Sequence, residues 1–171
     1  MRNVKLLVIS ICLGLLFVSC GTTSTKAVAF PGMYEEKPTV MLIMPPINNS
    51  NYVDAKDYFY TTMNVPLAEA GYYVLPPAAT LATMQRESAY DSERFIDGDV
   101  KRFGKIFGAD VAIFTIIQGW EKSVIGSAVI IEIEYVFKST KTNEVLYRRK
   151  ARLNCDTSSN VRTNGLFSGL I

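Results

Sequence analysis

Apolar residues occur in short continuous blocks along this chain, and most blocks are bounded by proline, glycine or asparagine. The block at 40–44 ends at Pro45, and such blocks are typical of strands buried on both faces of a sheet. A similar block at 72–75 also ends at a proline. The block at 111–117 is the most apolar, so we expect it to form the central strand.

Between these blocks, apolar residues recur at steps of three and four, which predicts helices with one buried face. The first helix begins after Asp54, and its expected buried residues are Tyr58, Phe59, Met63 and Leu67. Pro66 lacks a backbone N–H, so we expect a kink or a new start near Asn64. Gly71 is expected to end the helix in the left-handed conformation.

Two further helices are expected before the central strand. The second covers 80–88 with a weaker pattern, and 89–96 forms a loop or a short turn. The third is capped by Asp97 or Asp99, ends at Gly108, and buries Val100, Phe103, Ile106 and Phe107.

Residues 128–137 and 144–153 alternate between apolar and charged side chains, which predicts a hairpin with one buried face and a turn at 139–143. A register symmetrical about the turn pairs Glu134 with Arg148, Glu132 with Lys150, Tyr135 with Tyr147 and Phe137 with Val145. Opposite charges paired in this way stabilise a hairpin by about 0.2–1 kcal/mol each. The register leaves Arg149 on the apolar face.

Together these elements predict a single α/β domain over residues 39–171. Its mixed sheet has about five strands and is flanked by helices. The chain is long enough for one such domain to have a substantial core.

The first 19 residues have the organisation of a secretion signal. Arg2 and Lys5 precede an apolar run at 6–18 and the small residue Ser19. Cys20 comes next, as in bacterial lipoproteins, which are cut before this cysteine and acylated on it. A transmembrane helix would need about 20 apolar residues, more than this run contains. We therefore expect Cys20 to carry acyl chains, including palmitate, that anchor the protein in a membrane.

The residues that follow Cys20 predict a location and a tether. Gly21 takes the place where an aspartate would retain a lipoprotein in the inner membrane, which favours the outer membrane. Residues 20–38 have the composition of a tether, and their apolar cluster at 30–34 either packs on the domain or contacts a partner. At the other end, 164–171 is apolar, and we expect the chain to be truncated at this end.

Composition excludes several functions. The chain has 18 basic and 16 acidic residues, but two basic residues leave with the signal, so the mature chain is neutral. A neutral domain argues against a nucleic-acid partner. Histidine is absent from the sequence, which excludes Ser–His triads, Cys–His dyads and imidazole metal sites. Cys155 then lacks a partner within the mature chain, and is either buried and inert or paired between molecules.

Without histidine, an enzyme would have to rely on carboxylates, on serine and lysine, or on tyrosine. Glu132 and Glu134 could act as an acid–base pair, but the basic residues opposite them favour a solvated ion-pair face. The acidic residues at 91–99 lack the spacing of a calcium loop, and the Asp97-Gly98-Asp99 stretch is expected to cap a helix. We therefore expect no catalytic residue, no metal site and no cofactor.

Four residues are candidates for contact with a partner. Trp120 follows the central strand, where it either anchors a partner or fills the edge of the core. Tyr60 is expected on a different helix face from Tyr58, which the spacing places in the core. Asn48 and Asn49 begin a polar loop that extends to residue 51.

Four stretches of the chain resemble a known family. They are PPINNS at 45–50, DYFYTT at 57–62, PLAEAGYYVLP at 66–76 and FGADV at 107–111. Over about residues 38–155, the chain resembles the bacterial putative-lipoprotein family of unknown function typified by a Neisseria surface antigen. That family is similar in fold to the curli-secretion lipoprotein CsgG and to the N-terminal domain of TolB. It often accompanies a CsgG-like lipoprotein, which implies a role in an envelope assembly or transport complex.

These observations favour a non-enzymatic envelope lipoprotein that assists assembly of a secretion or transport complex. Its expected partners are the membrane, through the anchor, and envelope proteins, a CsgG-like lipoprotein among them. A homo-oligomer is compatible with this interpretation. The alternative is a periplasmic binding module for a small molecule, a glycan or peptidoglycan, which would need a concave pocket with converging polar groups.

Overall fold

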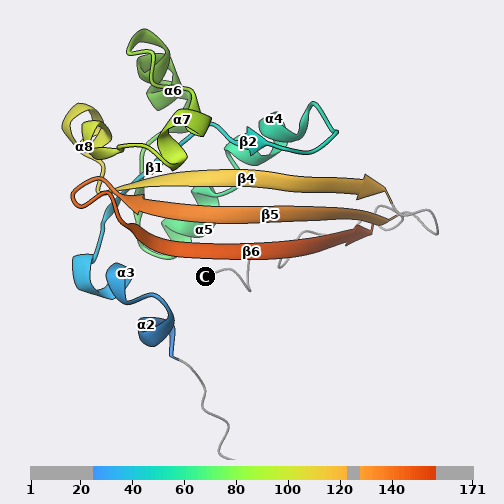
Figure 1. The fold of residues 1–171 in the computed structure, drawn as a ribbon, viewed down its shortest axis with the longest axis horizontal. Coiled ribbons are helices and arrows are strands. Elements are labelled where there is room, and N and C mark those ends of the chain that lie inside the picture. Colours follow the sequence, from blue (N-terminus) through green and yellow to red (C-terminus); the bar gives the residue numbers. More distant parts are fainter. Residues whose placement is uncertain (1–24, 123–127, 157–171) are drawn as a thin grey trace, which may run out of the picture.

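The computed structural model describes residues 25–122 and 128–156, which fold around one mixed sheet (Figure 1). Within these residues the strands are β1 Val40–Ile43, β2 Ile47–Asn48, β3 Tyr73–Val74, β4 Val111–Lys122, β5 Ala128–Ser139 and β6 Val145–Asp156. The strand order is β3–β1–β4–β5–β6, and β2 pairs with β4 beyond the end of β1. The pairs that involve β1 or β2 are parallel, whereas β4, β5 and β6 are antiparallel.

The predicted fold class is confirmed, with one strand more than expected. All five predicted strands form, and β4 lies between β1 and β5 as the predicted central strand. The sixth, β2, has only two residues and includes Asn48, which the sequence placed in a loop. A segment this short shows no periodicity, so its pairing with β4 becomes visible only in the fold.

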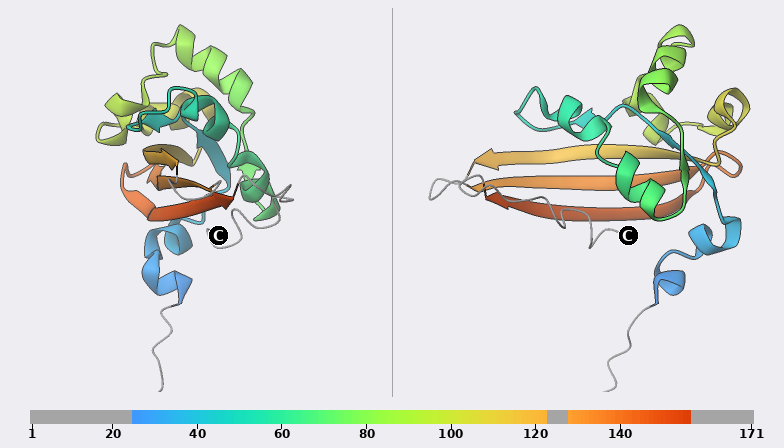
Figure 2. Two further views of the ribbon diagram at one scale, coloured as in Figure 1. Left: turned by 90° about the vertical axis from the view of Figure 1, so that its right-hand side faces the viewer. Right: turned by 180° about the vertical axis from the view of Figure 1, so that it is seen from behind.

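Helices cover both faces of the sheet (Figure 2). They are α4 Ala55–Tyr60, α5 Asn64–Glu69, α6 Pro77–Arg86, α7 Ser92–Ile96 and α8 Lys101–Phe107. The first two pack into one core, around Phe59 and Leu67. The other three pack into a second core on the opposite face, around Met84, Phe95 and Phe103.

Strand β4 contributes to both cores, which explains its continuous apolar sequence. Val111 and Ile113 face the core that contains α4 and α5, and Ala112 and Phe114 face the other core. Successive side chains of a strand point to opposite faces, so a strand covered on both sides is apolar at every position.

The predicted hairpin forms, but its register was wrong by two residues. Glu134 lies opposite Lys150, whereas the symmetrical register placed it opposite Arg148. A shift of two keeps the side chains from Tyr147 onward on their predicted faces, because the side-chain period of a strand is two.

The turn and a β-bulge next to it each contribute one residue to this shift, because Ser139 bonds to Glu144 across the turn. Phe137 pairs with Tyr147 and Lys138 pairs with Val145, so Leu146 is an extra residue in β6. The bulge also reverses two predicted orientations: Leu146 is 5% exposed, and Val145 is 45% exposed.

The break in the first helix was predicted correctly, but the burial of Tyr58 was wrong. Helix α4 ends at Tyr60 and α5 begins at Asn64, as the proline indicated. Because these are two helices with a turn between them, the spacing from Tyr58 to Leu67 does not describe one continuous face. Tyr58 is 59% exposed, whereas Phe59, Met63 and Leu67 are buried.

Other helix predictions are confirmed in part. Gly71 and Gly108 have φ angles of 92° and 66°, the left-handed conformations expected of them. Residues 92–96 form the short helix α7 within the predicted loop or short turn. Ile106 is 38% exposed, so it does not share the buried face of Val100 and Phe103.

The apolar cluster at 30–34 packs back on the domain. Two short helices, α2 Lys26–Ala29 and α3 Pro31–Glu36, lie within the segment predicted as a tether. The Phe30 ring lies 4.4 Å from that of Tyr147 on β6. Glu36 accepts hydrogen bonds from the hydroxyls of Ser139 and Thr142, at 2.7 and 3.0 Å, which fixes α3 to the turn of the hairpin.

The predictions about the two ends of the chain lie outside the described residues. These are the signal at 1–19, the acylated Cys20 and the apolar segment at 164–171. In the ranges described, no helix has the length and apolar character that crossing a membrane requires.

Candidate contact site

An aromatic cluster lies on one side of the sheet beside the end of β4. It comprises Trp120 on β4, Tyr52 in the loop before α4, and Tyr58 on α4. The Trp120 and Tyr52 rings are stacked, with centroids 4.5 Å apart, and the Tyr58 ring lies 6.1 Å from Trp120. Phe59 supports Trp120 from the core in an edge-on contact at 6.2 Å. We call Tyr52, Tyr58 and Trp120 the aromatic patch.

The patch is partly open to solvent. Tyr58 is 59% exposed, the neighbouring Val53 is 85% exposed, and Trp120 and Tyr52 are half-buried. A shallow hollow of about 500 Å³ adjoins the patch, and its walls include Asn51 and Lys122. Hydrogen bonding to the Tyr58 phenol, with some burial, raises the pKa of Tyr52 above its ordinary value. At neutral pH Tyr52 is therefore uncharged.

Asn48 organises the loop that carries Tyr52. Its side-chain amide donates to the carbonyl of Tyr52 at 2.8 Å, and its oxygen accepts from both the backbone N–H and the hydroxyl of Ser50. The Ser50 hydroxyl in turn accepts from the Tyr52 N–H. Asn48 is therefore a positioning residue for the patch, whereas the sequence indicated a direct contact.

Asn49 is the first of a series of hydrogen-bonded polar side chains that crosses the sheet. Its amide donates to Gln118 at 3.3 Å, and Gln118 donates to Glu134 at 3.3 Å. Glu134 also accepts from Arg148 at 2.8 Å. This series lies on the face of the sheet opposite the core that contains α4 and α5.

Tyr60 does not belong to the patch. Its hydroxyl donates to the carbonyl of Pro77 at 3.0 Å, which links the end of α4 to the start of α6. Burial raises the pKa of Tyr60 despite an opposing hydrogen bond with Thr80. The roles expected of the two tyrosines are thus exchanged: Tyr58 is exposed in the patch, and Tyr60 holds two helices together.

The carboxylates of β5 form ion pairs, as predicted, although one of them is buried. Glu134 is 4% exposed and lies between Arg148 and Lys150, with N–O distances of 2.8 and 3.9 Å. Glu132 lies 3.6 Å from Arg152 at the surface. Both carboxylates therefore take part in ion pairs between β5 and β6, the arrangement that the sequence favoured.

Among the acidic residues at 91–99, Asp99 has a capping contact. Asp99 accepts a hydrogen bond from the Lys101 N–H at the start of α8, so it has the predicted capping role. Over 25–122 and 128–156, no cluster of cysteine and carboxylate groups has the geometry to hold a metal ion. Cys155 is a free thiol, half-buried beside the core.

Sequence reasoning found Trp120 but missed the rest of the patch. Tyr52 lies in a loop without periodicity, and Tyr58 was assigned to the core by its spacing. The cluster of tyrosines at 52–60 was the sequence feature that could have indicated the patch. Which of these tyrosines lie in the patch and which in the core depends on where α4 ends.

A family comparison classifies the chain. The model of the family described as "Putative lipoprotein GNA1162-like" matches residues 29–171. The chain belongs to this family, as the resemblance in its motifs indicated. Putative lipoprotein NMB1124/NMB1162 of Neisseria meningitidis serogroup B is 22% identical over 169 residues, which cover 98% of this chain and 78% of that protein.

Solved structures show the same fold. The crystal structure of lipoprotein GNA1162 from Neisseria meningitidis matches with a TM-score of 0.65 and 21% identity, over 78% of this chain and 92% of that one. The LpoB C-terminal domain from Salmonella enterica matches with a TM-score of 0.51 and 14% identity, over 67% and 82%. A PelC dodecamer from Paraburkholderia phytofirmans matches with a TM-score of 0.50 and 10% identity, over 77% and 78%. The expected likeness to CsgG and TolB stays a prediction.

Proposed function

We propose that this protein is a non-enzymatic lipoprotein of the bacterial envelope that assists assembly of a secretion or transport complex. It acts by binding a protein partner through the aromatic patch. The observation that supports this proposal is the exposed stack of Tyr52, Tyr58 and Trp120, held in place by a hydrogen-bonded loop and by the core beneath it.

The composition of the patch suits a protein contact. Tryptophan and tyrosine are enriched among the residues that contribute most to binding, and they act best when partly sheltered from water. The Trp120 ring is fixed between Tyr52 and Phe59, so little conformational freedom would be lost on binding. Val53 extends the apolar surface beside it.

Membrane attachment is the second part of the proposal. The family is one of lipoproteins, and Cys20 is the residue that would carry the acyl chains. The outer membrane is the proposed location, because Gly21 takes the place of a retention aspartate. The anchor would keep the patch close to a bilayer, where envelope complexes assemble.

Two kinds of protein partner fit this proposal. One is a CsgG-like lipoprotein, which the family resemblance implies. The other is a second copy of this chain, because the PelC neighbour in fold is a dodecamer. A nucleic-acid partner is not proposed, since the mature chain is neutral.

Site-specific photocrosslinking in cells tests the proposal. A photoreactive phenylalanine analogue at Tyr58 is expected to capture an envelope protein or a second copy, and Trp120→Ala is expected to abolish the product. The matched control is the same analogue at Tyr90, which is 54% exposed on a different part of the surface. Equal products at the two positions, or no product at Tyr58, would contradict a role of the patch in protein contact.

A glycan or peptidoglycan ligand is the second candidate. A flat aromatic face beside the amide of Asn51, which lines the same hollow, could hold a sugar ring, whose hydroxyls need donors and acceptors. Trp120 is the single tryptophan of the chain, so its fluorescence reports directly on the patch. Saturable quenching by soluble muropeptides, lost in Asn51→Ala, would favour this function over protein assembly.

A further inference from the structure

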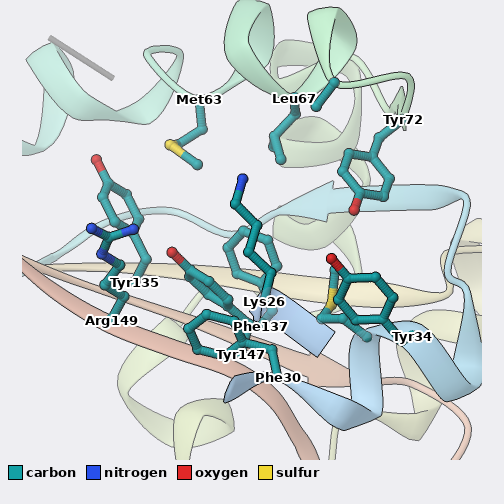
Figure 3. Close-up of a pocket in the computed structure, with 12 residues that line it drawn as sticks. Lys26, Phe30, Tyr34, Met63, Leu67, Tyr72, Tyr135, Phe137, Tyr147 and Arg149 are labelled. Atoms are coloured by element: carbon teal, nitrogen blue, oxygen red, sulfur yellow. The ribbon is translucent and has the colours of Figure 1, made fainter. Parts of the chain in front are cut away.

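A second hollow lies away from the aromatic patch, between the N-terminal helices and the sheet (Figure 3). Its volume is about 310 Å³. Helices α2 and α3 form one wall, Met63 and Leu67 form the opposite wall, and β5 and β6 close it from behind. Ligand pockets typically have volumes of about 300–1,000 Å³, so this one suits a small molecule.

The lining of this pocket combines aromatic rings with positive charge. Phe30, Phe137 and four tyrosines contribute rings, and Lys26 and Arg149 contribute the charges. The lining contains no carboxylate. Among the described residues, neither cation forms an ion pair. The pocket is therefore apolar in its walls and positively charged at its rim.

Tyr135 adds a buried hydroxyl that has no partner. The residue is 1% exposed and lines the pocket, and its hydroxyl makes no hydrogen bond with the described residues. An unsatisfied buried polar group carries a free-energy cost, and native structures satisfy most such groups. Burial, with a smaller effect of Tyr147, raises the pKa of Tyr135 strongly, so its hydroxyl remains protonated and can donate.

The orphan hydroxyl and one of the cations belong to the same part of the pocket. Tyr135 on β5 lies directly opposite Arg149 on β6, and both side chains are at one end of the pocket in Figure 3. A guanidinium and a phenol O–H are both donors, and they share an acceptor readily. Arg149 is a charged residue on an otherwise apolar face, and no described carboxylate pairs with it. A bound anion would explain its position.

We propose that this pocket binds a small amphiphilic anion, namely a carboxylate on a short apolar chain. The carboxylate accepts hydrogen bonds from Arg149 and Tyr135, with Lys26 as a second positive charge, and the chain lies among Phe30, Phe137 and Leu67. This inference does not depend on the partner proposed for the aromatic patch, because the two sites share no lining residue.

Calorimetry with matched probes tests the site. The full mature protein in lipid nanodiscs is titrated with octanoate, octanamide and octylammonium, and empty nanodiscs provide the blank for partition into lipid. Octanoate is expected to bind at one site per chain, with an affinity at least about tenfold higher than that of neutral octanamide. Equal affinities for the three probes, or no binding of octanoate above the blank, would overturn the proposal.

Three variants locate the binding to these residues. Arg149→Gln is expected to reduce octanoate affinity about tenfold and to leave octanamide unchanged. Lys150→Gln removes the same charge from the next position of β6, on the opposite face of the sheet, and is expected to change neither affinity.

Tyr135→Phe keeps the ring and removes only the hydroxyl. It is expected to weaken octanoate binding several-fold without lowering the melting temperature. If Lys150→Gln weakened binding as much as Arg149→Gln, the affinity for octanoate would depend on the net charge of the protein. The assignment of binding to this pocket would then be wrong.

Discussion

The carboxylate of Asp110 pairs with Lys141 and so connects segments that are far apart in the chain. Lys141 lies in the turn between β5 and β6, and its Nζ is 2.9 Å from one oxygen of Asp110. The other oxygen accepts hydrogen bonds from the backbone N–H groups of Thr39 and Val40, at 2.9 and 3.0 Å. The aspartate that precedes β4 thus fixes both the start of β1 and the hairpin turn, which gives a structural reason for the Gly-Ala-Asp sequence at 108–110.

Asp110 should make stability depend on pH in acid. Burial alone would raise the pKa of Asp110, but the hydrogen bonds from Lys141, Val40 and Thr39 outweigh it and lower the pKa. The contribution is therefore complete above the unfolded-state value of about 3.9, and is lost as the pH falls through the lower folded-state value.

Urea denaturation at pH 7 and at points between pH 5 and pH 2 checks this prediction. Asp110→Asn is expected to lower the free energy of unfolding by about 1–2 kcal/mol at pH 7 and to flatten its decline in acid. Lys141→Gln, which leaves the two backbone hydrogen bonds in place, is expected to have a smaller effect. An unchanged acid profile in Asp110→Asn would show that other groups control it.

Asn48 and Asn49 should differ sharply when each is replaced by alanine. Asn48→Ala removes the hydrogen bonds that shape the Tyr52 loop, and we expect a loss of about 1–2 kcal/mol. It should also weaken partner capture at Tyr58. Asn49→Ala removes one exposed hydrogen bond and is expected to change stability by less than about 0.5 kcal/mol. Thermal unfolding and Trp120 fluorescence measure both effects, and similar results for the two variants would contradict the assigned roles.

Two tyrosine-to-phenylalanine changes should have opposite effects on stability. Tyr60→Phe loses the hydrogen bond to Pro77 and is expected to destabilise the protein by about 1 kcal/mol. Tyr135→Phe removes a buried hydroxyl that has no partner among the described residues, and is expected to be neutral, or to stabilise by up to about 1 kcal/mol, in the absence of ligand. Chemical denaturation of the two variants in parallel measures the difference. A large loss in Tyr135→Phe would mean that its hydroxyl has a partner in solution.

Lys138 should be more important for stability than its position in a strand indicates. The residue is 4% exposed, and its ammonium donates to the carbonyls of Phe95, Ile96 and Gly98, at 3.4, 3.0 and 2.7 Å. Lys138→Met leaves these carbonyls at the end of α7 without a donor, and we expect a loss of about 2–4 kcal/mol. The control Lys150→Met removes an exposed lysine from the same sheet and should cost less than about 1 kcal/mol. Equal losses would refute the capping role of Lys138.

The elements of this fold were predictable where the local sequence controls them. The strands at 40–44 and 111–117 were recognisable because burial on both faces requires an unbroken apolar run. The helix break at Pro66 and the turns at Gly71 and Gly108 follow from backbone geometry, which depends on each residue alone.

The errors arose where long-range contacts decide the outcome. The hairpin register depends on the turn and on the bulge at Leu146, and no local pattern distinguishes that residue from its neighbours. Tyr58 and Tyr60 exchanged roles because their exposure depends on which elements pack against α4. The short strand β2 forms only because β4 continues beyond β1 and offers it an unpaired edge.

The sequence alone determined the family, the α/β class, the order of the strands along the chain, and the absence of histidine chemistry. These follow from composition, periodicity and motifs, which are properties of neighbouring residues. The tertiary structure decided which side chains meet: Trp120 with Tyr52, Arg149 with Tyr135, and Asp110 with Lys141. Both sites are built from segments far apart in the chain, and only the packing of the sheet and its helices brings such segments together.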